Sequence, residues 1–594
     1  MMKKLFTSLL VILTTLPLMA QGWPEKYEGV MLQGFYWDSY TDSNWANLES
    51  QADELSQFFN LIWIPNSGKT SAFYHNNSSK TMGYDPCFWL DHSTCFGTET
   101  QLRSMINTFK TKGTGIIEDV VINHKNGLNS WCDFPNESKN GYTLTWDNTN
   151  FSAICVNDEC NSSENLSQWS TNGKKTTGAA DTGDNFNGYR DLDHTNATVQ
   201  QNVKTYLNFL LKDLGYAGFR YDMVKGFSSS YIKTYNDNAQ PTYSVGEYWD
   251  GNVTLVRNWI NGTGKTSAAF DFPLKYYINN AFRSGSTSWA DLGKATLAND
   301  ADYARYAVTF VDNHDTGRPT TENGIPLYAN IEAANAFILT MPGTPCVWLK
   351  HWMTFKTALK KQILVRKAAG IHSQSSITTQ SASTAGYILN VQGTKGSVLL
   401  LLGAANTSTS GYKLAVEGTS YKMYVSENVD ISALDNIKDN EFTAPDCCVV
   451  NDGEICAFFE APTNYTSVKG YAWRGSIEYA GAWPGQACTK VGTNNGKNVW
   501  KWTYTGAQTT PPSNIIFNGT GFAQTADLDF QNGGYYNEAG ALQGAVTTAI
   551  EPILTTPAHN SRSVIYDLQG RRMGTSLQSL PKGLYIVNGK KVMR

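Results

Sequence analysis

The sequence predicts an α/β fold in which a (β/α)8 TIM barrel carries one irregular insertion and is followed by an all-β domain and a β-sandwich module. Segments with helical and strand periods alternate from about residue 30 to 350, and repeated strand–helix units over this length indicate a parallel barrel. Residues 125–190 interrupt the alternation, since they are rich in Asn, Ser, Gly and Thr. After about residue 372, short strand patterns separated by turn residues replace the helices.

The first strand–helix units can be followed residue by residue. The run 61–64 predicts a buried strand directly after the first helix. Thr98 and Gln101 form a capping-box pattern that begins the next helix, Gly113 ends it, and residues 116–122 predict the following strand. The apolar face of the first helix recurs at Leu48, Ala52, Leu55 and Phe59.

The later units repeat this pattern. A helical face covers residues 203–214 and ends at Gly215, and a strand is predicted at residues 217–221. Further short apolar runs predict strands at residues 243–245, 268–272, 307–311 and 345–348.

The length and composition indicate a multidomain globular protein. A chain of 594 residues is too long for one hydrophobic core, and 41% hydrophobic with 16% charged residues excludes a disordered chain. The net charge of −4 is not concentrated in a basic region, which argues against a nucleic-acid partner. The 12% of aromatic residues suits sugar binding, because aromatic rings stack on the flat C–H faces of sugars, although a large aromatic core would explain it equally well.

The amino terminus predicts a secreted protein. Lys3 and Lys4 precede an apolar stretch over residues 5–16, and Ala20 offers a small residue for cleavage by a signal peptidase. No segment is long and apolar enough to predict a transmembrane helix.

Ten cysteines are compatible with disulfides in an exported protein. Cys155 with Cys160 and Cys87 with Cys95 are neighbours in sequence that could pair, but the sequence leaves the connectivity open. No CxxC pair or His-rich spacing indicates zinc.

The chain is expected to divide where its composition changes. The expected parts are a signal peptide (1–20), a barrel domain (21–372) that includes the inserted B domain (125–190), a β-rich C domain (373–440), a small β-sandwich module (450–540), a Thr/Pro/Ala-rich linker (541–560) and a short tail (561–594).

Four segments place polar side chains directly after apolar strands. Because the carboxyl ends of the strands form the reactive face of a (β/α)8 barrel, side chains from all four are expected to meet in one pocket. A single Asp in such a place is more often a helix cap or turn residue, but four segments in this order favour an active site. The segments are Asp119-Val-Val-Ile-Asn-His124, Gly218-Phe-Arg-Tyr-Asp-Met-Val-Lys-Gly226, Val245-Gly-Glu-Tyr-Trp249 and Phe310-Val-Asp-Asn-His-Asp315.

These segments resemble the signature regions of the α-amylase family of glycoside hydrolases, family 13. The resemblance covers about residues 29–440 and is closest to plant and bacterial α-amylases at residues 30–37 and 189–196. It implies endo-hydrolysis of α-1,4-glucosidic bonds in starch and related α-glucans by double displacement, with retention of the anomeric configuration. We expect the enzyme to be a monomer.

The resemblance implies distinct roles for three carboxylates. Asp222 matches the nucleophile, Glu247 the general acid and base, and Asp315 the carboxylate that binds sugar hydroxyls and stabilises the oxocarbenium-like transition state. Arg220 lies two residues before Asp222 on one strand, so both side chains share a face and the guanidinium would keep the carboxylate ionised and orient it. Glu247 must be protonated at rest, so its surroundings should raise its pKa.

Other matched positions are expected to contact the sugar. His124 and His314 match hydroxyl donors, and Tyr84 matches the aromatic residue that stacks on the sugar ring. Lys225 matches a position that contacts the sugar on the leaving-group side. Residues 346–352 depart from the family, in which a Tyr-Asp or similar pair usually follows the last barrel strand.

Calcium is the metal that the resemblance implies, bound between the barrel and the insertion by oxygen ligands. Asn123, Asp191 and the carbonyl oxygen of Gly226 match the ligand positions of the family. Asp181 and Asp184 are additional candidates, and an ordinary loop turn explains those two equally well.

Residues 450–537 resemble a small starch-binding module of carbohydrate-binding module family 26. Tyr471 and Trp473 alternate on one strand and therefore share a face, and Trp483 stands beside a proline that would hold it outward. We expect these three rings to bind starch, and the two tryptophans of residues 500–502 to fill the core of the module.

Two further readings of the sequence stay open. A transglycosylase or debranching enzyme built on the same barrel would carry the same carboxylates and differ only in its acceptor-site loops. A non-catalytic glycan-binding protein would usually lose one carboxylate, whereas this chain keeps all three. The tail resembles the C-terminal secretion-sorting tails of exported proteins of Bacteroidetes, which implies an extracellular or cell-surface location.

Overall fold

The computed structural model describes residues 22–70, 81–166, 173–318, 325–437 and most of 444–546, together with the backbone of four short strands in the tail. The gaps within the fifth range are residues 452, 462–464, 480, 495, 520–523, 538–539 and 541. The predicted signal peptide (1–20) and most of the predicted linker lie outside the described residues. The chain divides into two compact units, Met1–Ile437 and Lys438–Arg594, and each is described by itself.

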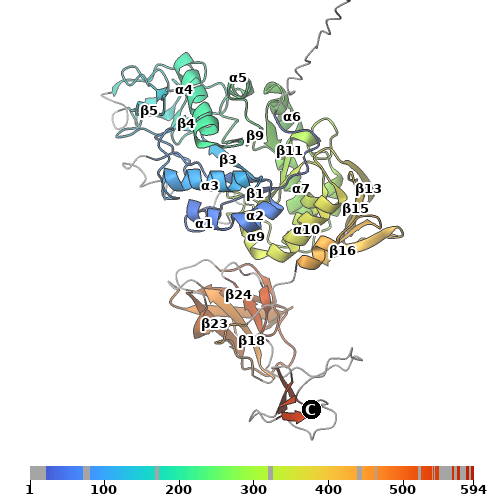
Figure 1. The fold of residues 1–594 in the computed structure, drawn as a ribbon. Helices are drawn as coiled ribbons and strands as arrows, with labels where there is room; N and C mark the ends of the chain where they lie inside the picture. Colours follow the sequence, from blue (N-terminus) through green and yellow to red (C-terminus); the bar gives the residue numbers. More distant parts are fainter. Residues whose placement is uncertain are drawn as a thin grey trace, which may run out of the picture. The chain divides into compact units, whose positions relative to one another are not determined.

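Eight parallel strands close a barrel in the first unit (Figure 1), which confirms the predicted fold class. The order around the barrel is β1-β12-β11-β10-β9-β8-β3-β2. Seven of the strands lie where apolar runs predict them. The eighth, β1, pairs with β2 and β12 and is too short to show a period. The bounds are β1 Met31–Gln33, β2 Leu61–Ile64, β3 Gly115–Val120, β8 Gly218–Tyr221, β9 Tyr243–Gly246, β10 Ala268–Phe270, β11 Ala307–Phe310 and β12 Thr344–Trp348.

Helices connect the barrel strands. The expected capping box of α3 is present, since Thr98 and Gln101 exchange side-chain and backbone hydrogen bonds. The predicted first helix is two helices, divided at Gln51. The helices are α1 Trp45–Ser50, α2 Ala52–Phe58, α3 Glu99–Thr111, α4 Ala197–Asn208, α5 Ser229–Ala239, α6 Val253–Gly262, α7 Phe272–Phe282, α8 Ile331–Thr340, α9 Leu349–Thr354 and α10 Lys356–Ala369, with short 3-10 turns η2 Glu159–Asn161, η5 Trp289–Gly293, η6 Ala304–Tyr306 and η7 Ser432–Asn436.

The helix expected at residues 203–214 changes character before its end. After α4 the chain continues as a π-helix, η4 (Phe209–Leu214), and stops at Gly215. Gly215 has φ 89°, a left-handed conformation that glycine adopts without the steric cost of a Cβ atom.

The insertion after β3 is held at its base by a short ribbon. Strand β4 (His124–Lys125) pairs with β7 (Arg190–Asp191), so the first and last residues of the insertion lie side by side. A second ribbon, β5 (Glu137–Lys139) with β6 (Tyr142–Leu144), lies within it. The insertion therefore begins and ends beside the carboxyl end of β3.

A five-stranded antiparallel sheet follows the barrel in the first unit. Alternate residues of its central strands face opposite sides, so Leu400 and Leu402 join the core of the barrel while Leu399 and Leu401 form a small cluster on the other face. The strands are β13 Ser376–Ala382, β14 Gly386–Gln392, β15 Ser397–Gly403, β16 Tyr412–Gly418 and β17 Tyr421–Ser426, in the order β13-β14-β15-β17-β16.

The second unit contains a β-sandwich. Phe459, Trp502 and Phe517 lie in the core between its sheets, and Trp500 and Trp502 are buried, as expected. One sheet contains β18 Ile455–Ala461, β22 Thr489–Asn494, β23 Lys497–Tyr504, β26 Gly534–Tyr536 and β27 Leu542–Ala545; the other contains β19 Val468–Arg474, β20 Ile477–Glu478, β21 Gln486–Ala487, β24 Asn514–Gly519 and β25 Leu528–Asp529.

The tail forms a four-stranded sheet, of which only the backbone is described. Its strands are β28 Ile565–Tyr566, β29 Arg572–Gly574, β30 Leu584–Val587 and β31 Lys590–Met593, in the order β29-β28-β30-β31. Across the described parts of the chain, none of the helices has both the length and the apolar character needed to span a bilayer.

Candidate active site

The three predicted carboxylates meet at the carboxyl ends of their strands. Asp222 follows β8, Glu247 follows β9 and Asp315 follows β11. All three line one cavity of about 550 Å³. The other predicted residues that line it are Tyr84, His124, Asp184, Lys225 and Gly226.

Arg220 links the carboxylates beneath this cavity. Its Nη1 atom lies 2.6 Å from Oδ1 of Asp222 and 2.7 Å from Oδ1 of Asp119, and its Nη2 atom lies 2.7 Å from Oε1 of Glu247. The guanidinium also lies over the ring of Trp63, 4.9 Å from its centroid. One planar, permanently charged group therefore orients three carboxylates at once.

Asp119 is a positioning residue that the sequence analysis missed. It is fully buried on β3, where its carboxylate accepts hydrogen bonds from Nε1 of Trp63 at 3.0 Å and from the hydroxyl of Tyr84 at 2.7 Å, besides its ion pair with Arg220. An Asp inside an apolar strand, at the start of a recognised segment, was a signal that could have revealed it. Asp119 therefore helps to fix the Nη1 atom of Arg220 that also contacts Asp222.

The surroundings of Glu247 favour its protonated form. Burial raises the pKa of Glu247 well above its usual range, and the carboxylates of Asp222 and Asp315 raise it further, against the lowering effect of Arg220. The backbone N–H of Met223 lies 3.2 Å from Oε2 of Glu247 and donates to it. A carboxylic acid that keeps its proton at neutral pH can act as a general acid.

His314 and Asp315 lie beside the aromatic side of the cavity. Nε2 of His314 lies 2.6 Å from the hydroxyl of Tyr84 and 3.2 Å from Oδ2 of Asp315. Burial, with the charge of Arg220, holds the pKa of His314 well below its usual range, so the imidazole is neutral. Burial also raises the pKa of Asp315 to about 6, while Arg220 lowers it.

A stack of parallel rings forms one wall. The ring of Tyr84 lies parallel to His314, at 5.3 Å and 6°, and to Trp37, at 5.8 Å and 2°. Sugar rings bind to such faces through their C–H groups. Trp37 and several other rings of the cavity were missed individually, although most stand in segments that the sequence analysis quoted. The additional aromatic residues that line the cavity are Trp37, Phe186, Tyr189 and Trp249.

His124 and Lys225 lie at the border between barrel and insertion. Nε2 of His124 lies 2.8 Å from the carbonyl oxygen of Tyr84, and its ring lies 4.8 Å from that of Phe186. Nζ of Lys225 pairs with Oδ2 of Asp250 at 2.8 Å. Both predicted side chains are thus positioned by neighbours at the edge of the cavity.

Four of the five predicted calcium ligands gather next to the cavity. Asn123 donates from Nδ2 to Oδ1 of Asp191 at 3.3 Å, and the carboxyl groups of Asp181 and Asp191 are within hydrogen-bonding reach of each other. A Cβ atom on Gly226 would lie 1.8 Å from Oδ1 of Asn123, so this amide oxygen lies against the Gly226 backbone. Asp184, the fifth, lines the cavity, and its N–H donates to the carbonyl oxygen of Lys225 at 2.8 Å.

The chemistry of this oxygen cluster fits a calcium ion. Burial, together with the charge of the adjacent Asp181, raises the pKa of Asp191 to about 8, which is the electrostatic situation that a bound cation relieves. The described residues contain no group of three or more His, Cys, Asp and Glu side chains able to hold a metal. A calcium ion here would therefore also depend on the neutral oxygens of Asn123 and Gly226.

The three rings predicted to bind starch gather on the surface of the second unit. Tyr471 lies 5.3 Å from Trp473 and 5.6 Å from Trp483, between ring centroids. Trp483 is 50% exposed. Glu478, which the sequence analysis passed over, accepts a 2.6 Å hydrogen bond from the hydroxyl of Tyr471 and so fixes the orientation of that ring.

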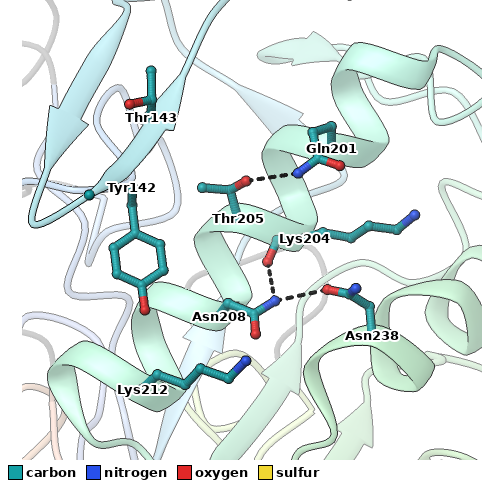
Figure 2. Close-up of a pocket in the computed structure, with 9 residues that line it drawn as sticks. Tyr142, Thr143, Gln201, Lys204, Thr205, Asn208, Lys212 and Asn238 are labelled. Carbon is teal, nitrogen blue, oxygen red and sulfur yellow. Dashed lines mark hydrogen bonds between the residues drawn. The ribbon is translucent and has the colours of Figure 1, made fainter.

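A second cavity in the first unit has a different character. It measures about 590 Å³ and lies against α4 (Figure 2). Asn208 donates from Nδ2 to the carbonyl oxygen of Lys204 and to Oδ1 of Asn238, both at 2.8 Å. Its lining contains amides, hydroxyls and lysines but no carboxylate, and none of the predicted site residues. The acid–base chemistry therefore belongs to the first cavity.

Known proteins share both parts of this arrangement. Residues 70–351 match the family model "Alpha amylase, catalytic domain", and residues 457–530 match "Starch-binding module 26". This chain carries an α-amylase-family catalytic domain and a starch-binding module. It is a glycoside hydrolase.

Individual relatives agree with this assignment. The "Probable alpha-amylase 2" of Arabidopsis thaliana is 29% identical over 374 residues, which are 60% of this chain and 84% of the relative. The glucan 1,4-alpha-maltotetraohydrolase of Stutzerimonas stutzeri is 27% identical over 417 residues, which are 64% of this chain and 69% of the relative. A solved structure, Gamma-CGTASE from alkalophilic Bacillus clarkii, has a TM-score of 0.52 at 14% identity, covers 87% of this chain and 99% of its own, and supports the fold alone.

The role of Asp119 can be tested by replacing it with Asn. Asp119→Asn removes one negative partner of Arg220 and should lower kcat on soluble starch by about 10–100-fold with little change in KM, as is typical when an outer positioning partner is lost. Asp237→Asn is the matched control, since Asp237 pairs with Lys233 on the surface of α5. Wild-type kcat in Asp119→Asn would contradict the role.

Proposed function

We propose that this protein is a secreted, calcium-dependent α-amylase that cleaves internal α-1,4 bonds of starch with retention of the anomeric configuration. The observation that carries the proposal is the contact of Arg220 with both Asp222 and Glu247 at the bottom of the cavity. One guanidinium reaches both carboxyl groups only when they lie close together. Retaining glycosidases need such a short separation, about 5–5.5 Å, because one carboxylate attacks the sugar directly.

The reaction proceeds in two displacements. Glu247 donates its proton to the oxygen of the leaving glucan while a carboxylate oxygen of Asp222 attacks the anomeric carbon, giving a covalent glycosyl–enzyme and a shortened chain. Glu247, now ionised, takes a proton from water, and the water oxygen attacks the same carbon and releases Asp222. Two inversions at one carbon give net retention.

Asp315 and its neighbours act on the sugar itself. The carboxylate of Asp315 accepts hydrogen bonds from sugar hydroxyls and opposes the positive charge that develops on the ring in the transition state. Tyr84 offers its ring face to the same sugar, in the stack with Trp37 and His314. As an endo-acting enzyme requires, the cavity would accommodate a chain that continues on both sides of the cleaved bond.

Asn123, Asp181, Asp191 and Gly226 would hold the calcium ion. A bound Ca²⁺ supplies positive charge that neutralises the two carboxylates and ties the insertion to the barrel. Asp181 and Asp191 belong to the end of the insertion, whereas Asn123 follows β3 and Gly226 follows β8. The ion would therefore support the wall that carries His124 and Lys225.

Secretion and starch retention complete the proposal. The basic residues and apolar stretch before residue 20 support export, and the tail supports sorting to the cell surface or medium. The rings of Tyr471, Trp473 and Trp483 would bind a glucan helix and keep insoluble starch close to the catalytic unit.

The products formed from starch test the proposed reaction. Short linear products, with the α-anomer appearing first in proton NMR, would agree with the proposal. Cyclic products would indicate transglycosylation, and a β-anomer would exclude Asp222 as the nucleophile.

The acid role of Glu247 predicts a leaving-group dependence. Glu247→Gln should lower kcat/KM on starch by about 10²–10⁴-fold, because the glucan oxygen must be protonated as it leaves in the first displacement. The kcat/KM on an α-maltosyl fluoride should fall much less, since fluoride leaves without a proton. Glu54→Gln, a change in a surface ion pair with Lys356 and Lys360, is the control. Equal losses on both substrates would contradict this assignment.

The raised pKa of Glu247 predicts the alkaline side of the pH profile. The active form is protonated, so kcat/KM is retained below this raised pKa and falls as the pH rises through it. The hydrolysis of the fluoride by Glu247→Gln should lack that alkaline fall. An unchanged alkaline limb in the variant would mean that another group titrates there.

Calcium removal should lower stability. Chelation with EGTA should lower the melting temperature of the catalytic unit by about 5 °C when the starting calcium concentration is about 100-fold above Kd. Calcium should restore it, and Asp191→Asn should weaken the response. Asp237→Asn is the control and should respond like the wild type. A melting temperature that does not change on addition of chelator would contradict the calcium site.

The starch-binding surface predicts a separation of binding from turnover. Trp483→Ala should weaken retention on insoluble starch at least about tenfold, which corresponds to about 1.4 kcal/mol. The kcat on a short soluble maltooligosaccharide should not change. Val449→Ala, at a 59% exposed position of the same unit, is the control. Retention equal to that of the wild type would contradict this surface.

A further inference from the structure

We propose that Cys132 and Cys160 form a disulfide that closes the insertion upon itself beside the calcium-ligand cluster. The two side chains are 1% and 0% exposed, and both are thiols in the structure. The thiol of Cys132 is the largest influence on the thiol of Cys160 and raises its pKa, as expected for neighbouring side chains. Two buried thiols that neighbour each other are candidates for a disulfide.

The segment around Cys132 and the segment around Cys160 are also held together by contacts that do not involve sulfur. Arg190, itself 2% exposed, lies with its guanidinium carbon 4.0 Å from the ring centroid of Trp131. The same guanidinium forms ion pairs with Asp158 and with Glu159, the latter at 2.6 Å. The residue before Cys132 and the two residues before Cys160 are therefore fixed on one side chain. The proximity of the two sulfurs follows from the fold of the insertion.

The contacts of Cys155 argue against the other pairing of Cys160 that the sequence suggests, a disulfide between Cys155 and Cys160. Cys155 is nearest to Cys160 in the chain, but its thiol donates to Oδ1 of Asp181 at 3.0 Å. The pairing of Cys155 with Cys160, one of the possibilities that the sequence leaves open, is thus not the one that the fold favours. Within the described residues, no cluster with a third metal-ligating side chain includes Cys132 and Cys160.

The oxidation balances as an exchange between disulfides. The two thiols lose two protons and two electrons as the S–S bond forms, and a disulfide supplied by a thiol oxidoreductase or by oxidised glutathione accepts them and becomes two thiols. Such oxidants occur in the compartments through which exported proteins pass. The inference therefore depends on the proposed export for its oxidant, and not on the proposed reaction.

The cross-link would stabilise the wall that carries the calcium ligands. Oδ2 of Asp158 accepts a hydrogen bond from the backbone N–H of Asp191 at 2.8 Å, and the N–H of Cys155 donates to the carbonyl oxygen of Asp191 at 3.0 Å. Asp158 and Cys155 belong to the segment that ends in Cys160, whereas Asp191 lies on β7. A bond from Cys160 to Cys132 restrains this segment, and through it the position of Asp191.

Peptide mapping of the full chain tests the cross-link directly. After treatment with oxidised glutathione, free thiols are alkylated under denaturing conditions without reductant, and the digest is analysed by mass spectrometry. The expected result is one peptide pair joined through Cys132 and Cys160. Alkylation of both residues, or a bond from either to another cysteine, would overturn the proposal. This readout needs no activity, so its failure is distinct from a failure of the proposed function.

Thermal unfolding with and without dithiothreitol tests its effect. The oxidised wild type should lose about 5 °C in melting temperature on reduction, as expected for a closed loop of this length in a large unit. The double variant Cys132→Ser/Cys160→Ser should melt near the reduced wild type and not respond to reductant. Cys95→Ser, in the same unit, should respond like the wild type. Equal melting of reduced and oxidised wild type would mean that no such restraint exists.

Discussion

The candidate site depends on one buried guanidinium. Arg220 is fully buried, and its charge is tolerated there only because Asp119, Asp222 and Glu247 surround it. Loss of the guanidinium would leave three carboxylates together with no positive charge between them. This interaction explains the carboxylates on three otherwise apolar strands: Asp119, Asp222 and Glu247 each contribute a partner to the same group, and the barrel places the ends of these strands around one point.

Burial gives similar carboxyl groups different tasks. Desolvation raises the pKa of Glu247 and of Asp315, yet only Glu247 moves well above its usual range, since two other carboxylates add to its burial. The same desolvation keeps the imidazole of His314 neutral. An acid that holds its proton and a neutral imidazole beside the carboxylate of Asp315 thus both follow from burial.

Sequence patterns predicted the parts of the fold that depend on local signals. Apolar runs located seven barrel strands, whereas β1, with only three residues, shows no period of its own. The strand-end segments identified Asp222, Glu247 and Asp315 as neighbours. The position of Asp119 inside an apolar strand is a signal of an unusual role, but it does not reveal that Arg220 is the partner. The insertion was the least predictable part: Asp184 lines the cavity, and its backbone N–H bonds to Lys225, a residue far away in the sequence.

The insertion contains two acidic clusters that are neutralised in different ways. Asp158 and Glu159 have Arg190 between them, a side chain from the strand at the base of the insertion. Asp181 and Asp191 lie next to this cluster, and in the described part of the chain no Lys or Arg forms an ion pair with either, so their mutual repulsion must be relieved by protonation or by a cation. Because Asp191 directly follows Arg190, one short strand joins the two clusters. A cation at the second cluster and a covalent restraint near the first would therefore act on the same wall of the active site.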